Sequence, residues 1–134
     1  MEMGKGILGV VAGLAVWMIV VGVAGLLLRA AWPEYVSVAD AMKFTFSMKL
    51  ARLFIGALAT LATGLVTAVI ARSRTAILIA GALLLLMFIP QHVMLWDKFP
   101  IWYHLTFLLS LVPLTYVGGS GVIAWATGVR GSFS

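Results

Sequence analysis

The chain has 134 residues, of which 63% are hydrophobic and 10% are charged, against about 45–50% and about 25% in ordinary soluble domains. Nine Lys and Arg residues outnumber four Asp and Glu residues, and the absence of cysteine excludes disulfides, thiolate metal sites and thiol catalysis. The basic residues are scattered near the ends of apolar runs, where they can meet anionic lipid. We therefore expect membrane lipids as partners and exclude nucleic acid.

Four runs approach the ~20 apolar residues that a helix needs to cross a ~30 Å hydrocarbon core. They cover residues 6–28, 53–71, 75–95 and 101–123, and none contains Asp, Glu, Lys or Arg. The runs do not alternate between apolar and polar residues, as strands of a membrane barrel would. The sequence therefore predicts an all-α integral membrane protein, a four-transmembrane-helix bundle that forms a single membrane domain over residues 1–134.

Small and hydroxyl-bearing residues mark the faces on which these helices pack. Gly9 and Gly13 form a small-xxx-small pattern in the first run, which allows close approach of a second helix. We expect such faces to be contact surfaces in a homo-oligomer or a larger membrane complex. The second run carries a stripe of hydroxyls, which indicates either helix contacts or a hydrated cleft: Thr60, Thr63 and Thr67. The glycines within residues 118–121 predict that the last helix breaks there.

The only long connection lies between the first and second runs. Pro33 ends the first helix, because proline disfavours helical geometry in the residue before it. Ser37 and Asp40 have the spacing of a capping box, and no helix breaker follows before the second run. We therefore predict an amphipathic interfacial helix at about residues 38–50. Two basic side chains near its end are candidates for contact with an anionic headgroup or ligand: Lys49 and Arg52.

Residues 91–104 join the third and fourth runs and hold both histidines, two of the five tryptophans and one of the four acidic residues. The turn is tight, so the two histidines are expected at similar depth, where Asp97 is close enough in sequence to orient either imidazole. The segment predicts a ligand site at the outer rim of the bundle, although Trp and Tyr are also ordinary residues of a membrane interface. The candidate residues are His92, Trp96, Asp97, Trp102, Tyr103 and His104.

The ligand and the chemistry of this site stay open at the level of sequence. Two histidines without a recognised third ligand do not define a metal site, so no metal ligand is assigned. No nucleotide-binding loop, HExxH or GxSxG motif is present, and no catalytic residue is assigned. No acidic residue lies inside a predicted span, where proton-coupled transporters usually carry one. A lipid, a quinone and a metal are the alternatives for a ligand.

The charges also predict an orientation. Four spans put both termini on one side, with four Lys and Arg residues there and five on the other side. The short turn that holds Arg72 and Arg74 has no acidic residue, whereas Glu34, Asp40 and Asp97 lie on the opposite side. We therefore expect both termini in the cytoplasm.

Three segments resemble those of small four-helix bacterial inner-membrane proteins of unknown function: LLRAAWPEY at 27–35, ARL at 51–53 and LWDKFPIWYH at 95–104. The resemblance covers most of the chain, up to about Gly119. It implies a location in the bacterial inner membrane and supplies neither an activity nor site residues.

These observations lead to one functional hypothesis and two alternatives. The hypothesis is a non-catalytic inner-membrane protein that acts as an accessory subunit or forms an oligomer. The first alternative is a membrane protein that binds a lipid, quinone or metal at the outer-rim site. The second is a small oligomeric channel or transporter, which rests on the threonine stripe and on similar hydroxyls in the fourth run, Thr106 and Ser110.

Overall fold

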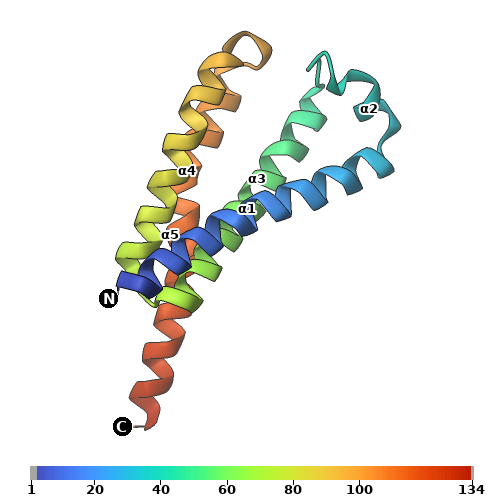
Figure 1. Cartoon of the computed structure of the whole chain (residues 1–134). Coiled ribbons are helices and arrows are strands. Elements are labelled where there is room, and N and C mark those ends of the chain that lie inside the picture. Colours follow the sequence, from blue (N-terminus) through green and yellow to red (C-terminus); the bar gives the residue numbers. More distant parts are fainter. Residues whose placement is uncertain (1–2, 134) are drawn as a thin grey trace.

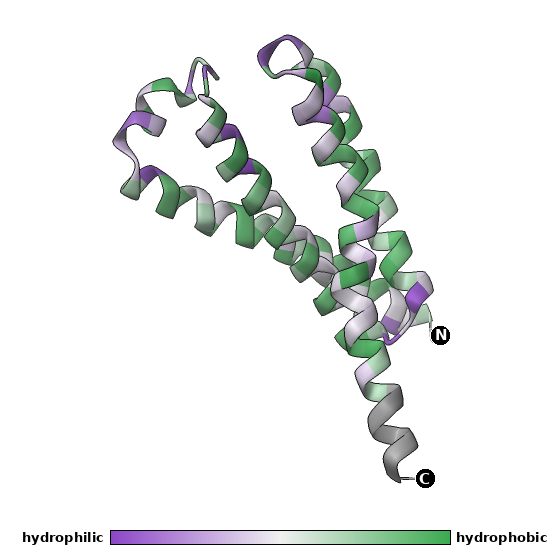
Figure 2. Ribbon diagram, turned by 180° about the vertical axis from the view of Figure 1, so that it is seen from behind, coloured by the Kyte–Doolittle hydropathy of each residue, from purple (hydrophilic) through white to green (hydrophobic). Residues whose placement is uncertain are grey.

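The computed structural model describes residues 3–133, with side chains described for residues 3–126. Within these residues there are five α-helices and one short 3₁₀ helix, which are α1 (Met3–Ala31), α2 (Pro33–Ala39), α3 (Phe46–Ala71), α4 (Arg74–Met94), η1 (Trp96–Lys98) and α5 (Ile101–Phe133). The helices α1, α3, α4 and α5 are long and apolar enough to span a membrane, and Figure 2 shows apolar residues along their length. The predicted all-α fold with four long apolar helices is confirmed.

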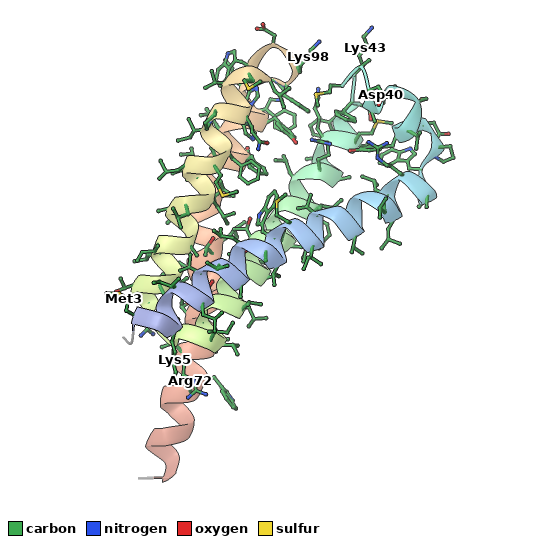
Figure 3. The ribbon with its side chains drawn as sticks, in the orientation of Figure 1. Met3, Lys5, Asp40, Lys43, Arg72 and Lys98 are labelled. Atoms are coloured by element: carbon green, nitrogen blue, oxygen red, sulfur yellow. The ribbon has the colours of Figure 1, made fainter. Side chains whose placement is uncertain are left out.

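The four long helices form a bundle that is narrow at one end and wide at the other (Figure 1). The helices α4 and α5 run side by side, and α1 crosses α3 near the N-terminus. The two pairs diverge toward α2 and η1, which we call the wide end. Lys5 and Arg72 lie at the narrow end, whereas Asp40, Lys43 and Lys98 lie at the wide end (Figure 3). Both ends of the described chain lie on the side of the narrow end (Figure 1).

At the narrow end α1 packs closely against α3 through glycines and threonines. The hydroxyl of Thr63 donates to the carbonyl oxygen of Gly13 at 2.9 Å, and that of Thr67 donates to the carbonyl of Gly9 at 3.1 Å. A Cβ atom on Gly13 would lie 2.9 Å from the carbonyl oxygen of Thr63. The threonine stripe is therefore a helix–helix contact. The glycine face that was expected to mediate contacts between chains packs here within one chain, where Gly9 and Gly13 are both buried.

The helix α5 meets α3 through a second group of glycines. Gly64 lies against the backbone of Thr115, and Gly118 lies against the carbonyl group of Leu61. The helix continues without interruption to Phe133, so the predicted break within residues 118–121 is wrong. The glycines are needed there because only residues without a side chain allow the two backbones this close approach.

The predicted interfacial helix over residues 38–50 is also wrong. The chain forms a shorter helix, α2, with Pro33 in its first turn, and then reverses before α3 begins. The amide of Met42 donates to the carbonyl of Ala39, and the amide of Lys43 donates to the carbonyl of Val38. These two bonds, with Met42 at a φ of 54°, form a Schellman motif that ends the helix. That position usually holds Gly or Asn, so Met42 gives no signal in the sequence.

The caps on either side of this turn also differ from the predicted capping box. The hydroxyl of Ser37 donates to the carbonyl oxygen of Glu34 within α2, so it does not cap a helix. Thr45 takes that role for α3, because its hydroxyl oxygen accepts from the amide of Met48. As a result α3 begins at Phe46, earlier than the predicted span at 53, and Arg52 lies inside a long helix rather than before it. The predicted end of α1 before Pro33 is confirmed.

We predict that Gly64→Ala lowers the stability of the bundle. The new methyl group would overlap the backbone of Thr115, and overpacking of this kind costs about 1–3 kcal/mol. Thermal unfolding of the purified protein in mild detergent measures the effect as a lower midpoint. Gly22→Ala is the matched control, because nothing lies within 4 Å of its added Cβ atom. Equal midpoints for the two variants would contradict the close α3–α5 crossing.

Candidate ligand site

A cavity of about 340 Å³ lies where the helices diverge, and residues of all five α-helices line it. This volume is within the range of about 300–1,000 Å³ that is usual for small-molecule sites. The polar side chains that line it are Tyr35, Arg52, Gln91, His92 and Tyr103. Met18 of α1 and Met87 of α4 also line it and are 60% and 44% exposed. The cavity therefore reaches the surface of the protein between α1 and α4.

Arg52 of α3 supplies the positive charge of this cavity. Its Nε donates to the hydroxyl of Tyr103 at 3.1 Å, and its Nη1 donates to the hydroxyl of Tyr35 at 2.8 Å. The guanidinium carbon also lies 4.7 Å from the ring centre of Phe44 and 5.6 Å from that of Phe99, which are cation–π distances. No carboxylate among the described residues pairs with it. Two hydroxyls and two rings therefore contact this partly buried charge.

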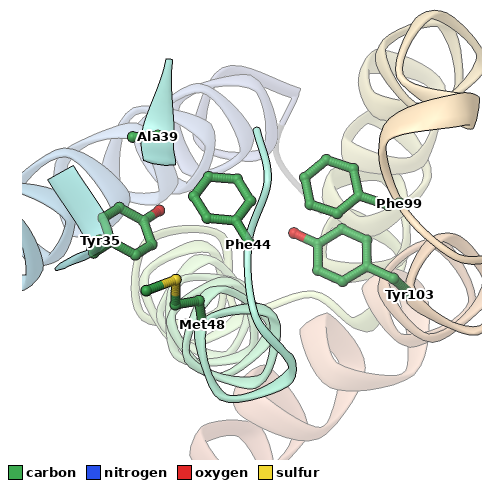
Figure 4. Close-up of a cluster of buried hydrophobic side chains, with 6 residues drawn as sticks. All are labelled: Tyr35, Ala39, Phe44, Met48, Phe99 and Tyr103. Carbon is green, nitrogen blue, oxygen red and sulfur yellow. The ribbon is translucent and has the colours of Figure 1, made fainter. Parts of the chain in front are cut away.

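A series of stacked rings covers Arg52 at the wide end. Ring centres are 5.0 Å apart for Tyr35 and Phe44, 5.8 Å for Phe44 and Phe99, and 4.3 Å for Phe99 and Tyr103. Phe44 lies between Tyr35 and Phe99 in Figure 4. These rings come from α2, from the connection before α3, from the connection after η1 and from α5. They join the two helix pairs at the end where their backbones are farthest apart (Figure 1).

Aromatic rings also form the deeper wall of the cavity, toward the narrow end. Trp17 of α1 lies 4.6 Å from Phe88 of α4, and Phe88 lies 5.2 Å from Phe107 of α5, measured between ring centres. The indole Nε1 of Trp17 donates to the hydroxyl of Thr60 at 3.1 Å. This bond satisfies the one polar atom of Trp17 and leaves its ring as an apolar surface in the cavity.

The two histidines lie in direct contact beside Arg52. Nδ1 of His92 is 2.7 Å from Nδ1 of His104, and Nε2 of His104 is 3.2 Å from the backbone carbonyl oxygen of Trp96. The indole ring of Trp96 stacks on His104, with ring centres 4.6 Å apart and planes at 7°. His104 is fully buried, whereas His92 lines the cavity. The structure thus brings together His92, Trp96, Tyr103 and His104 from the candidate set.

Asp97 lies apart from these histidines. Its side chain is exposed on η1, and within the described residues neither histidine hydrogen-bonds to it. The carbonyl of Trp96 orients His104 where a carboxylate was expected. The described part of the chain also contains no group of three His, Asp, Glu or Cys residues that could hold a metal. A metal centre at this position has no structural support from those residues.

Two other candidates lie outside the cavity. Trp102 packs against Phe46, with ring centres 5.6 Å apart, on the exposed side of α5. Lys49 lines a separate open pocket of about 400 Å³, together with Lys43, Asp97 and Lys98. Lys49 and Arg52 therefore do not form one anion site, and Arg52 alone carries charge into the cavity.

Tyr35 and Trp17 are two of the cavity residues outside the candidate set predicted from the sequence. Tyr35 reaches Arg52 only because the chain turns back after α2, and Trp17 reaches the cavity because α1 crosses α3. For Arg52, which the sequence did point to, the structure adds its depth, because a helix that starts at the Thr45 cap places Arg52 inside a candidate span. A charged residue within a span is a functional candidate by default.

Fold and site together define an all-α protein with four helices that could span a membrane and a charged, aromatic cavity between them. Comparison with protein-family models, with curated proteins and with solved structures finds no match for this chain.

We predict that the double variant Tyr35→Phe, Tyr103→Phe is less stable than the parent protein. Both hydroxyl partners of Arg52 are lost, and each hydrogen bond to a charged group is typically worth about 1.5–3 kcal/mol. Thermal unfolding in mild detergent should show a lower midpoint. Tyr116→Phe, on the exposed side of α5, is the control and should leave the midpoint unchanged. An unchanged midpoint in the double variant would mean that these hydroxyls do not support Arg52.

Proposed function

We propose that this chain is an integral membrane protein that binds an acidic lipid, with the lipid headgroup at Arg52 in the central cavity. The observation that carries the proposal is a guanidinium that lines a largely aromatic cavity and has no carboxylate partner among the described residues. Removing a charge from water is costly unless an opposite charge and hydrogen bonds compensate for it. An anionic headgroup would supply both.

The hydrogen-bonding groups around Arg52 favour an anion over a neutral quinone. A guanidinium has five N–H donors, and Tyr35 and Tyr103 take two of them, which leaves three for a ligand. Both tyrosine oxygens accept from Arg52, so each can still donate its own hydroxyl hydrogen. The site therefore offers several donors and a positive charge to the same ligand atoms. A phosphate or carboxylate matches that set, whereas a quinone carbonyl leaves the charge unpaired.

The depth of Arg52 and the opening of the cavity suit a lipid. Arg52 lies six residues after the first residue of α3, which is about 9 Å along a helix at 1.5 Å per residue. In a spanning helix this is near the level of lipid headgroups. The acyl chains can leave the cavity between α1 and α4, past Met18 and Met87, whose flexible side chains adapt to an irregular ligand.

This proposal favours the ligand-binding alternative over an accessory or oligomer-forming role. The glycine faces that were expected to join separate chains are used between α1 and α3 of one chain. The threonines that would line a channel, including Thr63 and Thr67, are fully buried in the same contact. The burial of these groups within one chain supports the ligand-binding alternative.

We predict that Arg52→Gln loses a bound acidic lipid. Native mass spectrometry of the protein from gentle detergent should show a lipid adduct in the parent protein and at least a tenfold weaker one in the variant, as expected for loss of an interaction of about 1.5–3 kcal/mol. Arg29→Gln is the matched control, because Arg29 is exposed at the same end and does not line the cavity. An uncharged adduct such as a quinone, or equal adducts in both variants, would contradict the proposal.

In the membrane topology that we propose, the wide end lies at the outer face of the bacterial inner membrane and both termini lie in the cytoplasm. The chain has no cysteine, so single cysteines at two exposed positions report on it directly: Ser37→Cys in α2 and Thr75→Cys at the start of α4. In intact cells an impermeant maleimide should label the first and not the second, and permeabilised cells should label both. The reverse pattern would invert the orientation, and labelling of both in intact cells would contradict four spans.

A further inference from the structure

The contacts of the histidine pair fix which ring nitrogens carry hydrogen. Nε2 of His104 lies 3.2 Å from the carbonyl oxygen of Trp96, which can only accept, so Nε2 must donate. His104 is 0% exposed and has no carboxylate partner among the described residues, and a buried unpaired imidazolium is costly. His104 is therefore neutral, and its Nδ1 is an acceptor. Nδ1 of His92, 2.7 Å away, must then be the donor.

This assignment of hydrogens leaves one lone pair, on Nε2 of His92, that faces the cavity. Because Nδ1 of His92 carries hydrogen, Nε2 of the neutral ring is an acceptor. His92 is 8% exposed and lines the cavity. Within the described residues Nε2 has no hydrogen-bond partner, whereas every fully buried side-chain nitrogen or oxygen there has one. Nε2 is therefore not fully buried. The lone pair is therefore accessible from the cavity, next to a group of donors.

His92 and Arg52 act on the same part of the cavity, because both lie against Tyr103. The ring centre of His92 is 6.2 Å from that of Tyr103, whose hydroxyl accepts from Arg52. His92 is also stacked on Phe107 at 4.7 Å, which fixes its ring plane. A ligand held at Arg52 must therefore satisfy several donors and one acceptor within a single headgroup.

We propose that the cavity selects lipids whose headgroup is a phosphomonoester over lipids with a phosphodiester. This inference rests on the proposed function and adds the class of headgroup. A phosphomonoester that keeps one proton has negative oxygens for Arg52 and the two tyrosines, and a P–O–H that donates to Nε2 of His92. The phosphate of a phosphodiester has no such hydrogen, so a phosphodiester whose alcohol carries no donor leaves Nε2 of His92 without a partner, which is the costly arrangement.

The aromatic wall of the cavity distinguishes a lipid from a soluble phosphate ester. Trp17, Phe88 and Phe107 offer apolar surface that an acyl chain can cover and a soluble phosphate ester cannot. We therefore expect phosphatidic acid to bind and glycerol 3-phosphate, which has the same headgroup without acyl chains, to bind far more weakly. Equal binding of the two would overturn the assignment to a lipid.

The test compares phosphatidic acid with phosphatidylmethanol of identical acyl chains, titrated into the full-length protein in mild detergent at pH 6 and read by native mass spectrometry. At that pH about half of a phosphomonoester keeps its second proton, since the second pKa of a phosphate monoester is about 6. The parent protein should prefer phosphatidic acid by about tenfold or more, the usual effect of one lost hydrogen-bond partner. Phosphatidylmethanol is a phosphodiester with no hydroxyl, so it isolates the P–O–H group.

Two variants of His92 separate the role of its two nitrogens. His92→Asn keeps an amide near the position of Nδ1 and loses Nε2. The variant therefore lacks the acceptor that phosphatidic acid pairs with and phosphatidylmethanol leaves unpaired, so it should bind both lipids equally. His92→Gln can place its carbonyl oxygen near the position of Nε2 and should restore part of the preference. Retained binding of phosphatidylmethanol shows that each variant is folded.

The outcomes separate this inference from the proposed function. Equal affinity of the parent protein for both lipids, or an unchanged preference in His92→Asn, would overturn the headgroup assignment and leave acidic-lipid binding intact. Failure of either lipid to bind the parent protein would overturn both.

Discussion

The interactions of Arg52 are the constraint on which the wide end of this protein depends. The side chain comes from α3, but its partners come from α2, from both connecting segments and from α5. It therefore joins the two helix pairs where their backbones diverge (Figure 1). Hydrogen bonds to Tyr35 and Tyr103 fix its position without neutralising it. A carboxylate in place of either tyrosine would have held the same geometry and removed the attraction for an anion.

The divergence itself follows from the sizes of the side chains along the bundle. At the narrow end glycines such as Gly13 and Gly64 let backbones nearly touch, and threonine hydroxyls bond directly to the facing carbonyl groups. Toward the wide end the larger rings of Trp17, Phe88 and Phe107 lie between α1, α4 and α5. Together with two glycines, Gly25 and Gly56, these rings line the cavity that opens where the helices diverge.

The sequence predicts the four long helices well and the site only in part, for physical reasons. Apolar runs long enough to span are a local property, so their existence is readable from composition. The start of α3 is not, because a search for uncharged runs excludes Arg52, whereas the cap at Thr45 places it within the helix. The short connection brings His92 and His104 together, as their spacing suggests. The position of Tyr35 depends on a turn around Met42, which no local pattern encodes.

The same groups that would recognise a lipid also hold the wide end together, so binding and structure are linked. A headgroup at Arg52 would share a guanidinium that already bonds to α2 and α5. Any ligand that binds only this arrangement stabilises it, by an amount that grows with ligand concentration over the dissociation constant. The exchange of lipid would then occur between α1 and α4, beside the exposed side chains of Met18 and Met87. The glycine contacts at the narrow end need not change when the ligand enters or leaves.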